Sequence, residues 1–161
     1  MTNMDKTQAV IDFLLTCNEI MNSPLYLNFV NAKNGVNQLL TLESDKNINS
    51  PYIDGSVKKR YSLTFIVYLT ISVNPLVKLS DVNNENVADL ATVQALMDWV
   101  ELQNTNHTYP NFGADYLVEE IGTTTNNPRL DQIDATQSVP LARYSFTIYV
   151  DYIDFTKRLW K

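Results

Sequence analysis

Two segments of alternating apolar and polar residues constrain the fold of this chain more than any other feature of its sequence. Every second residue from position 63 to position 73 is apolar, and only Ile66 breaks the polar side of the pattern. Residues 144–152 repeat the alternation. Successive side chains of a strand point to opposite faces of a sheet, so each segment predicts a long β-strand with one buried face.

Two other segments have the three- and four-residue apolar spacing of amphipathic helices, residues 2–21 and residues 84–103. Thr2 is the expected N-cap of the first helix, and Asp5 lies near the positive end of its dipole. Pro24 prevents that helix from continuing. Trp99 lies on the second helix, where we expect it to pack in the core.

Shorter strands are expected at residues 25–29, 36–43 and 116–121. Asn34 and Gly35 form a dipeptide typical of tight turns, which predicts a hairpin between the first two of these strands. Residues 44–55 and 122–138 are predicted to be polar loops, and the second is long enough to be functional or mobile.

These elements predict an α+β fold, with a mostly antiparallel sheet and two main helices packed on one face. The length of 161 residues suits a single domain, and 45% hydrophobic residues supply a sizeable core. No apolar run approaches the roughly 20 residues that cross a bilayer, and no signal peptide pattern opens the chain. A single cysteine, Cys17, excludes a disulfide framework and favours a reducing cytoplasm.

The sequence offers few groups for catalysis. His107 is the only histidine and lies in a predicted loop, while Cys17 lies on an apolar helix stripe, where a small core residue is expected. One histidine and one cysteine cannot make a zinc site alone. Glu119 and Glu120 are adjacent on a predicted strand, so they are expected to point to opposite faces. We therefore predict no enzymatic activity, no catalytic residue, no metal and no cofactor.

Charge is distributed unevenly along the chain. The net charge of −6 argues against binding to nucleic acid phosphates. Between Lys78 and Arg129 there is no Lys or Arg. The eight carboxylates in that stretch belong to Asp81, Glu85, Asp89, Asp98, Glu101, Asp115, Glu119 and Glu120.

Helical spacing places Glu85 with Asp89, and Asp98 with Glu101, on shared faces. Three interpretations remain open. The acids form a negative channel wall in an assembly, or they pair with the basic cluster Lys58-Lys59-Arg60 of an adjacent subunit, or they are an ordinary solvated face.

The C-terminal segment suggests a contact with another chain. Phe155, Leu159 and Trp160 follow the last predicted strand, in a tail that is otherwise polar. Large apolar and aromatic side chains are favoured at protein interfaces. We expect these three residues to dock on a neighbouring subunit or partner.

A family resemblance rests on four segments. They are PYIDGSVKKRYSLTFIVYLTIS from Pro51, LMDWVELQN from Leu96, YLVEEIG from Tyr116 and ARYSFTIYVDYID from Ala142. Their order resembles that of the small minor capsid or tail terminator proteins of phages and prophages of low-GC Gram-positive bacteria. The resemblance covers roughly residues 51–154, and it extends more loosely over the N-terminal helix and hairpin.

The resemblance implies an α+β subunit of a homo-oligomeric ring, usually a hexamer, at the head-proximal end of a virion tail. Such a ring stops polymerisation of the tail tube and joins the tail to the head–tail connector protein, so the partners would be other copies, the tube protein and the connector. The subunit would be made in the cytoplasm of the host bacterium. The resemblance attaches interface roles to Asp54, Gly55, Lys58, Lys59 and Arg60.

Three alternatives remain. The chain could be a head–tail connector or tail completion protein of the same particle, or its tube subunit. The third is a cytosolic small-molecule-binding or catalytic domain, which would require a pocket with convergent polar groups.

Overall fold

The computed structural model of the chain describes residues 2–18, 20, 25–28, 33, 35–41, 46–71, 79–136 and 138–159. In chain order the elements are α1 (Asn3–Leu14), β1 (Leu25–Leu27), β2 (Asn37–Thr41), β3 (Lys46–Asn47), β4 (Val57–Thr70), α2 (Leu79–Thr105), β5 (Tyr116–Thr123), β6 (Arg129–Asp134) and β7 (Leu141–Asp154).

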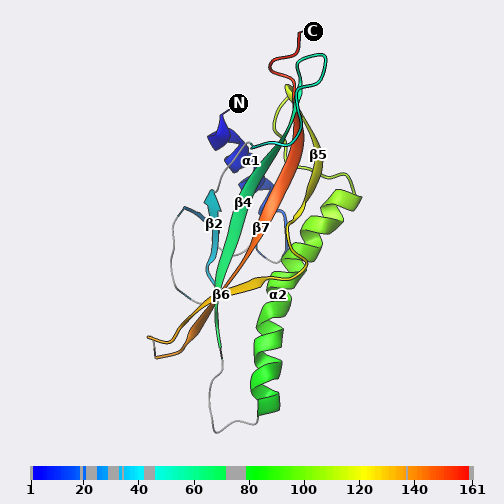
Figure 1. Cartoon of the computed structure of the whole chain (residues 1–161). Helices are drawn as coiled ribbons and strands as arrows, with labels where there is room; N and C mark the ends of the chain where they lie inside the picture. The colour runs from blue at the N-terminus through cyan, green and yellow to red at the C-terminus, as the bar shows by residue number, and fades with distance from the viewer. Residues whose placement is uncertain are drawn as a thin grey trace.

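The strands form one sheet around the long antiparallel pair of β4 and β7. The main order is β1-β2-β4-β7-β5, with β3 beside the start of β4 and β6 beside the start of β7. Val57 pairs with Asp154 at one end of the central pair, and Thr70 pairs with Leu141 at the other. Every pairing except that of β1 with β2 is antiparallel. The predicted α+β class and mostly antiparallel sheet are therefore confirmed (Figure 1).

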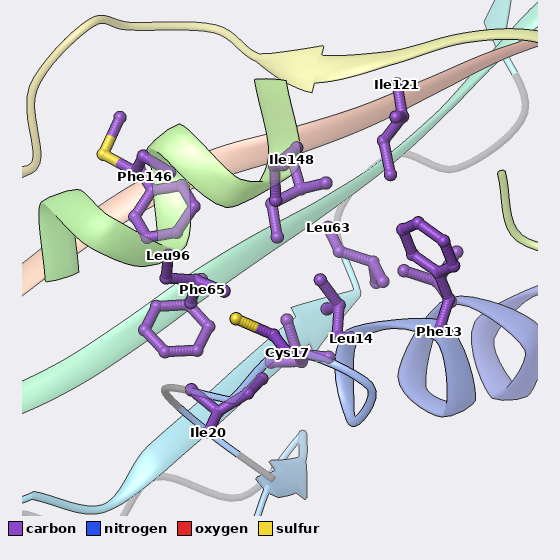
Figure 2. Close-up of a cluster of buried hydrophobic side chains, with 14 of the residues drawn as sticks. Phe13, Leu14, Cys17, Ile20, Leu63, Phe65, Leu96, Ile121, Phe146 and Ile148 are labelled. Carbon is purple, nitrogen blue, oxygen red and sulfur yellow. The ribbon is translucent and has the colours of Figure 1, made fainter. Parts of the chain in front are cut away.

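The main core lies between the sheet and the two helices (Figure 2). Alternate residues of both central strands point into it, as the sequence predicted. They are Tyr61, Leu63, Phe65 and Val67 of β4, with Ala142, Tyr144, Phe146, Ile148, Val150 and Tyr152 of β7. Each fully buried aliphatic or aromatic side chain contributes about 1.5–3 kcal/mol. Trp99 packs on this core beside Phe13, with 5.2 Å between the ring centroids.

Ile66, the residue that broke the alternation, is buried on the opposite face. It forms a second, smaller apolar cluster with Tyr68 and Leu141, against which Leu40 packs. The face without helices is therefore not uniformly polar.

Helix α1 starts where the sequence predicted and ends earlier. The Thr2 hydroxyl accepts a hydrogen bond from the Asp5 amide, and the Asp5 carboxylate accepts one from the Thr2 amide, which completes a capping box. The predicted extension was wrong for residues 15–18 and 20, where the Thr16 hydroxyl donates to the Phe13 carbonyl and competes with the helix backbone. Residues 19 and 21 lie outside the described part of the chain. Cys17 is nevertheless fully buried, so its predicted place in the core is confirmed.

The predicted hairpin between the first two strands was also wrong, because β1 and β2 run parallel. Gly35 does adopt the left-handed conformation of a turn, with φ of 71°. Its amide donates to the carbonyl of Tyr68, on β4. The turn therefore leads the chain toward β4, and β1 is joined to the far edge of β2.

Strand β6 lies inside the segment predicted to be a loop. A β-bulge between Leu130 and Gln132 shifts its register against β7, so its two apolar residues, Leu130 and Ile133, are three apart. The bulge breaks the two-residue period from which a strand is recognised in a sequence.

Candidate interaction surfaces

The residues considered for catalysis are described first. Among the described residues, no group of three or more His, Cys, Asp or Glu lies close enough to hold a metal ion. His107 is exposed just after α2, with φ of 53°, and its Nδ1 lies 3.2 Å from the Tyr109 hydroxyl. Neither helix, as far as its residues are described, is apolar enough over a sufficient length to span a membrane.

The basic cluster of β4 is paired within its own chain. Lys58 Nζ lies 2.9 Å from Glu119, and Lys59 Nζ lies 2.7 Å from Asp154. Arg60 forms a bidentate pair with Asp151, in which Nε and Nη2 donate to the two carboxylate oxygens at 2.6 and 2.8 Å. Sequence reasoning treated these three cations as available to a neighbouring subunit. The antiparallel register of β4 with β7 supplies two of the three partners, Asp151 and Asp154.

The Arg60 pair belongs to a larger polar cluster on the helix-free face. The Arg60 guanidinium lies 4.1 Å from the centre of the Tyr149 ring, and the Tyr149 hydroxyl donates to Glu120 at 2.7 Å. Burial, followed by the hydrogen bond to Glu120, raises the pKa of Tyr149. The hydrogen bond to Asp151 raises the pKa of Arg60. Arg60 and Asp151 neutralise each other, Glu120 accepts from Tyr149, and these contacts link β4, β5 and β7.

The expectation that Glu119 and Glu120 point to opposite faces was wrong. A β-bulge between Val118 and Glu120 shifts the register of β5 against β7. Glu119 pairs with Lys58 and Glu120 accepts from Tyr149, so both carboxylates reach partners on the helix-free face. A single extra residue on one strand changes which side chains share a face.

The acidic residues of α2 lie on a helix that contributes no basic residue to their surroundings. Asp98 and Glu101 are exposed; Asp98 accepts from Gln94 and Glu101 accepts from the Thr123 amide and hydroxyl. The side chains of Glu85 and Asp89 lie outside the described part of the chain.

The C-terminal tail folds back on the turn that precedes β4. The Leu159 amide donates to the Asp54 carbonyl at 2.8 Å, and Arg158 Nε lies 3.0 Å from the Asp54 carboxylate. Hydrogen bonds from Ser56 lower the pKa of Asp54. Gly55 has φ of 84°, and a Cβ there would lie 2.6 Å from the Lys157 carbonyl oxygen. The C-terminal tail therefore packs against Asp54 and Gly55 of its own chain.

The tail is fixed at two points along its backbone, and its last described side chain remains exposed. The Phe155 amide donates to the Asp115 carbonyl at 2.9 Å, and the Phe155 side chain is partly buried. The side chain of Leu159 is 69% exposed. Trp160 lies outside the described residues. The attachment of the tail to its own subunit was not predicted, and a contact of Leu159 with another chain stays a prediction.

Exposed apolar side chains gather at the two ends of the β4–β7 pair. We call the first group the tip: Tyr52, Ile53 and Leu159, of which Ile53 is 93% exposed. Tyr52 and Ile53 also line an open hollow of about 480 Å³ with Ile153. The second group, the arm, comprises Leu130, Ile133 and Val139 of the β6–β7 hairpin. Figure 1 shows this hairpin extending at lower left, away from the C-terminus at the top.

No protein-family model matches this sequence, and a search of curated proteins finds no relative.

Proposed function

We propose that this chain is a structural subunit that joins its own copies into a closed ring, and that the ring terminates the tail of a phage or phage-like particle. The observation that supports ring formation is that the tip and the arm, the two exposed apolar groups, lie at opposite ends of the β4–β7 pair. The tip adjoins Val57 and Asp154, whereas the arm adjoins Thr70 and Leu141. The fourteen residues of β4 span the distance between them, which is about 43 Å at 3.3 Å per residue step.

Two different apolar surfaces at opposite ends of a subunit favour heterologous contacts. A symmetric dimer buries the same patch on both copies, whereas contact of one surface with a different surface generates a ring or an open filament. The tip borders an open hollow, and the arm hairpin extends from the sheet, so we infer that the arm of one copy contacts the tip of the next. Because Lys58, Lys59 and Arg60 are already paired within the chain, apolar contact is the better candidate for subunit association.

The place of the ring in a particle is supported by the sequence resemblance. A terminator ring would sit in the virion at the head-proximal end of the tail, between the tube protein and the head–tail connector protein. A connector or completion ring and a tube subunit are the competing assignments. Electron microscopy separates them, since a tube subunit polymerises alone into long tubes, and imaging of the particle locates a terminator directly on the tube.

The ring is tested by two matched substitutions. Ile53→Ser at the tip and Ile133→Ser at the arm should each abolish closed rings in native mass spectrometry and negative-stain images. Both side chains are exposed, so each variant should unfold within about 0.5 kcal/mol of the wild type. Leu102→Ser, at an exposed apolar position of α2, is the control that should leave rings intact.

Mixing the two variants tests whether the contact is heterologous. Each variant retains one intact surface, so the arm of Ile53→Ser should bind the tip of Ile133→Ser and yield mixed dimers that cannot extend. Rings that survive both substitutions, or a wild-type symmetric dimer, would contradict the proposal.

The acidic stretch is proposed to give the ring a negative surface, with part of it facing the central channel. The internal pairing of the basic cluster supports this assignment over charge pairing between subunits. Replacing Glu85 and Asp89 with Lys should leave rings intact and impair DNA passage, because added cations bind phosphates. Loss of rings, with recovery when Lys58 is reversed as well, would support pairing between subunits instead. Lys59 and Arg60 are left unchanged in this test, because their partners in the chain, Asp154 and Asp151, are largely buried. Unchanged assembly and infection would identify a solvated face.

A further inference from the structure

A second hollow, of about 400 Å³, lies on the helix-free face near the base of the arm. Arg129, Asp131, Arg143, Ser145, Thr124 and Thr147 are among its lining residues. Arg129 pairs with Ser145 across β6 and β7, and the Thr124 amide donates to the Thr147 carbonyl, so the register of β7 brings these groups together. The proposed ring contacts do not use this hollow.

Arg143 is the group in the hollow whose hydrogen bonding is incomplete. Its Nε is buried and has no hydrogen-bond acceptor among the described residues. The nearest carboxylate oxygen, Asp131 Oδ2, is 3.6 Å away, which is within ion-pair range and too long for a hydrogen bond. The side chain is 27% exposed and lines the hollow. A buried donor without an acceptor costs about 1–3 kcal/mol, and more when it is charged.

Asp131 is held by other donors, and its Oδ2 stays beyond hydrogen-bond distance of Arg143 Nε. Arg129 Nε donates to its Oδ1 at 2.6 Å, and Ser145 donates a further hydrogen bond. Although β6 lies at the sheet edge, the Asp131 side chain is only 14% exposed. Burial alone would raise the pKa of Asp131, but the hydrogen bonds from Ser145 and Arg129 outweigh it and lower that pKa. The carboxylate is therefore ionised at neutral pH.

The sum of these charges favours an anion. Two guanidinium groups face one carboxylate, which leaves one positive charge in the hollow. Thr124 and Thr147 contribute hydroxyl groups, each able to donate to an anionic oxygen. A planar guanidinium with several donors in a fork matches a carboxylate or a phosphate.

We propose that this hollow is an oxyanion-binding site, in which Arg143 binds a carboxylate or phosphate group with Arg129 beside it. The ligand accepts hydrogen bonds from the guanidinium of Arg143, whose buried Nε has no acceptor in the described part of the chain. None of the apolar side chains that define the tip and the arm lines this hollow, although Arg129 and Asp131 flank Leu130 of the arm on β6. Anion binding is therefore measured separately from ring formation.

The test is a titration of the folded protein with inorganic phosphate and, separately, with acetate at neutral pH and constant ionic strength. The arginine Nε–Hε signals in a ¹⁵N-correlated NMR spectrum report binding directly. We expect a saturable shift of the Arg143 signal, and the anion that binds more tightly identifies the ligand as a phosphate or a carboxylate.

Three variants locate the site. Arg143→Lys keeps the charge and loses the fork, so affinity should fall about tenfold or more. Arg129→Gln, at a largely exposed side chain, should also weaken binding without altering thermal unfolding. Arg158→Gln, an arginine paired with Asp54 at the other end of the molecule, should bind like the wild type. Absence of a saturable shift with either anion, or equal affinity in Arg129→Gln and wild type, would overturn the proposal.

Discussion

Replacing Arg60 with Gln should destabilise the subunit itself, before any effect on assembly. The substitution removes both hydrogen bonds to Asp151 and the contact with the Tyr149 ring. The Asp151 side chain is only 5% exposed, so it would become a buried carboxylate without its cation. Breaking a buried ion pair in this way costs about 3–5 kcal/mol.

The Arg60 side chain is 40% exposed, so water can partly compensate for its loss. Solvent screening of this kind reduces the expected cost to about 2–3 kcal/mol. For a chain of this length, 1 kcal/mol lowers Tm by about 2–4 °C, so the expected decrease is about 5–10 °C.

Urea denaturation at neutral pH, followed by circular dichroism, measures this cost. Because assembly adds stability that depends on concentration, the comparison is best made in a background carrying Ile53→Ser and Ile133→Ser. Arg158→Gln is the matched control, since its pair with Asp54 is more exposed and should be worth less than about 1 kcal/mol. Adding Asp151→Asn completes a double-mutant cycle, in which a coupling of at least about 1.5 kcal/mol is expected.

The result that refutes this reasoning combines stability with assembly. If Arg60→Gln costs no more than Arg158→Gln and still abolishes rings, the guanidinium acts between subunits, as the sequence suggested. If Arg60→Gln lowers the free energy of unfolding by more than Arg158→Gln does, and the double-mutant cycle gives the expected coupling with Asp151, the guanidinium acts within the subunit.

Three further substitutions test other parts of the structure. Gly55→Ala combines a left-handed backbone with a clash against the Lys157 carbonyl, so it should cost about 1–3 kcal/mol in urea denaturation and expose the tail to proteases; unchanged stability would argue against this packing. Cys17→Ser buries a hydroxyl in the core and should cost about 1–3 kcal/mol while rings persist; lost rings at full stability would contradict a purely structural role. Burial would raise the pKa of Asp154, but hydrogen bonds, chiefly from Lys59, lower it below 3.8. Its stabilisation is therefore present above the unfolded pKa and is lost as pH falls below about 4, so stability should fall less steeply with acid in Asp154→Asn; parallel pH profiles would refute this.

The sequence predicted well those elements in which the pattern of apolar and polar residues along the element itself determines which side chains are buried. The alternation around Phe65 and Phe146 predicted β4, β7 and their buried faces, because side chains of a strand alternate regardless of which strand lies beside it. The capping box of α1 was partly visible for the same reason, since Thr2 and Asp5 are three residues apart.

The elements that sequence predicted poorly depend on where a strand pairs. The bulge after Leu130 removed the two-residue period of β6, and the bulge before Glu120 placed two adjacent carboxylates on one face. The arm was missed in consequence, because its strand was predicted to be a loop. The parallel pairing of β1 with β2 likewise depends on where Gly35 directs the chain.

The sequence by itself determined the composition of the candidate surfaces: a basic run at residues 58–60, an acidic stretch without cations, and an apolar end to the tail. Only the tertiary structure decided which of these charges are paired with an opposite charge within the same chain. Arg60 and Asp151 are 91 residues apart, and Lys59 and Asp154 are 95 apart. Such pairs are set by the register of β4 against β7, because the energy of a charge depends on its neighbours in space and on its burial.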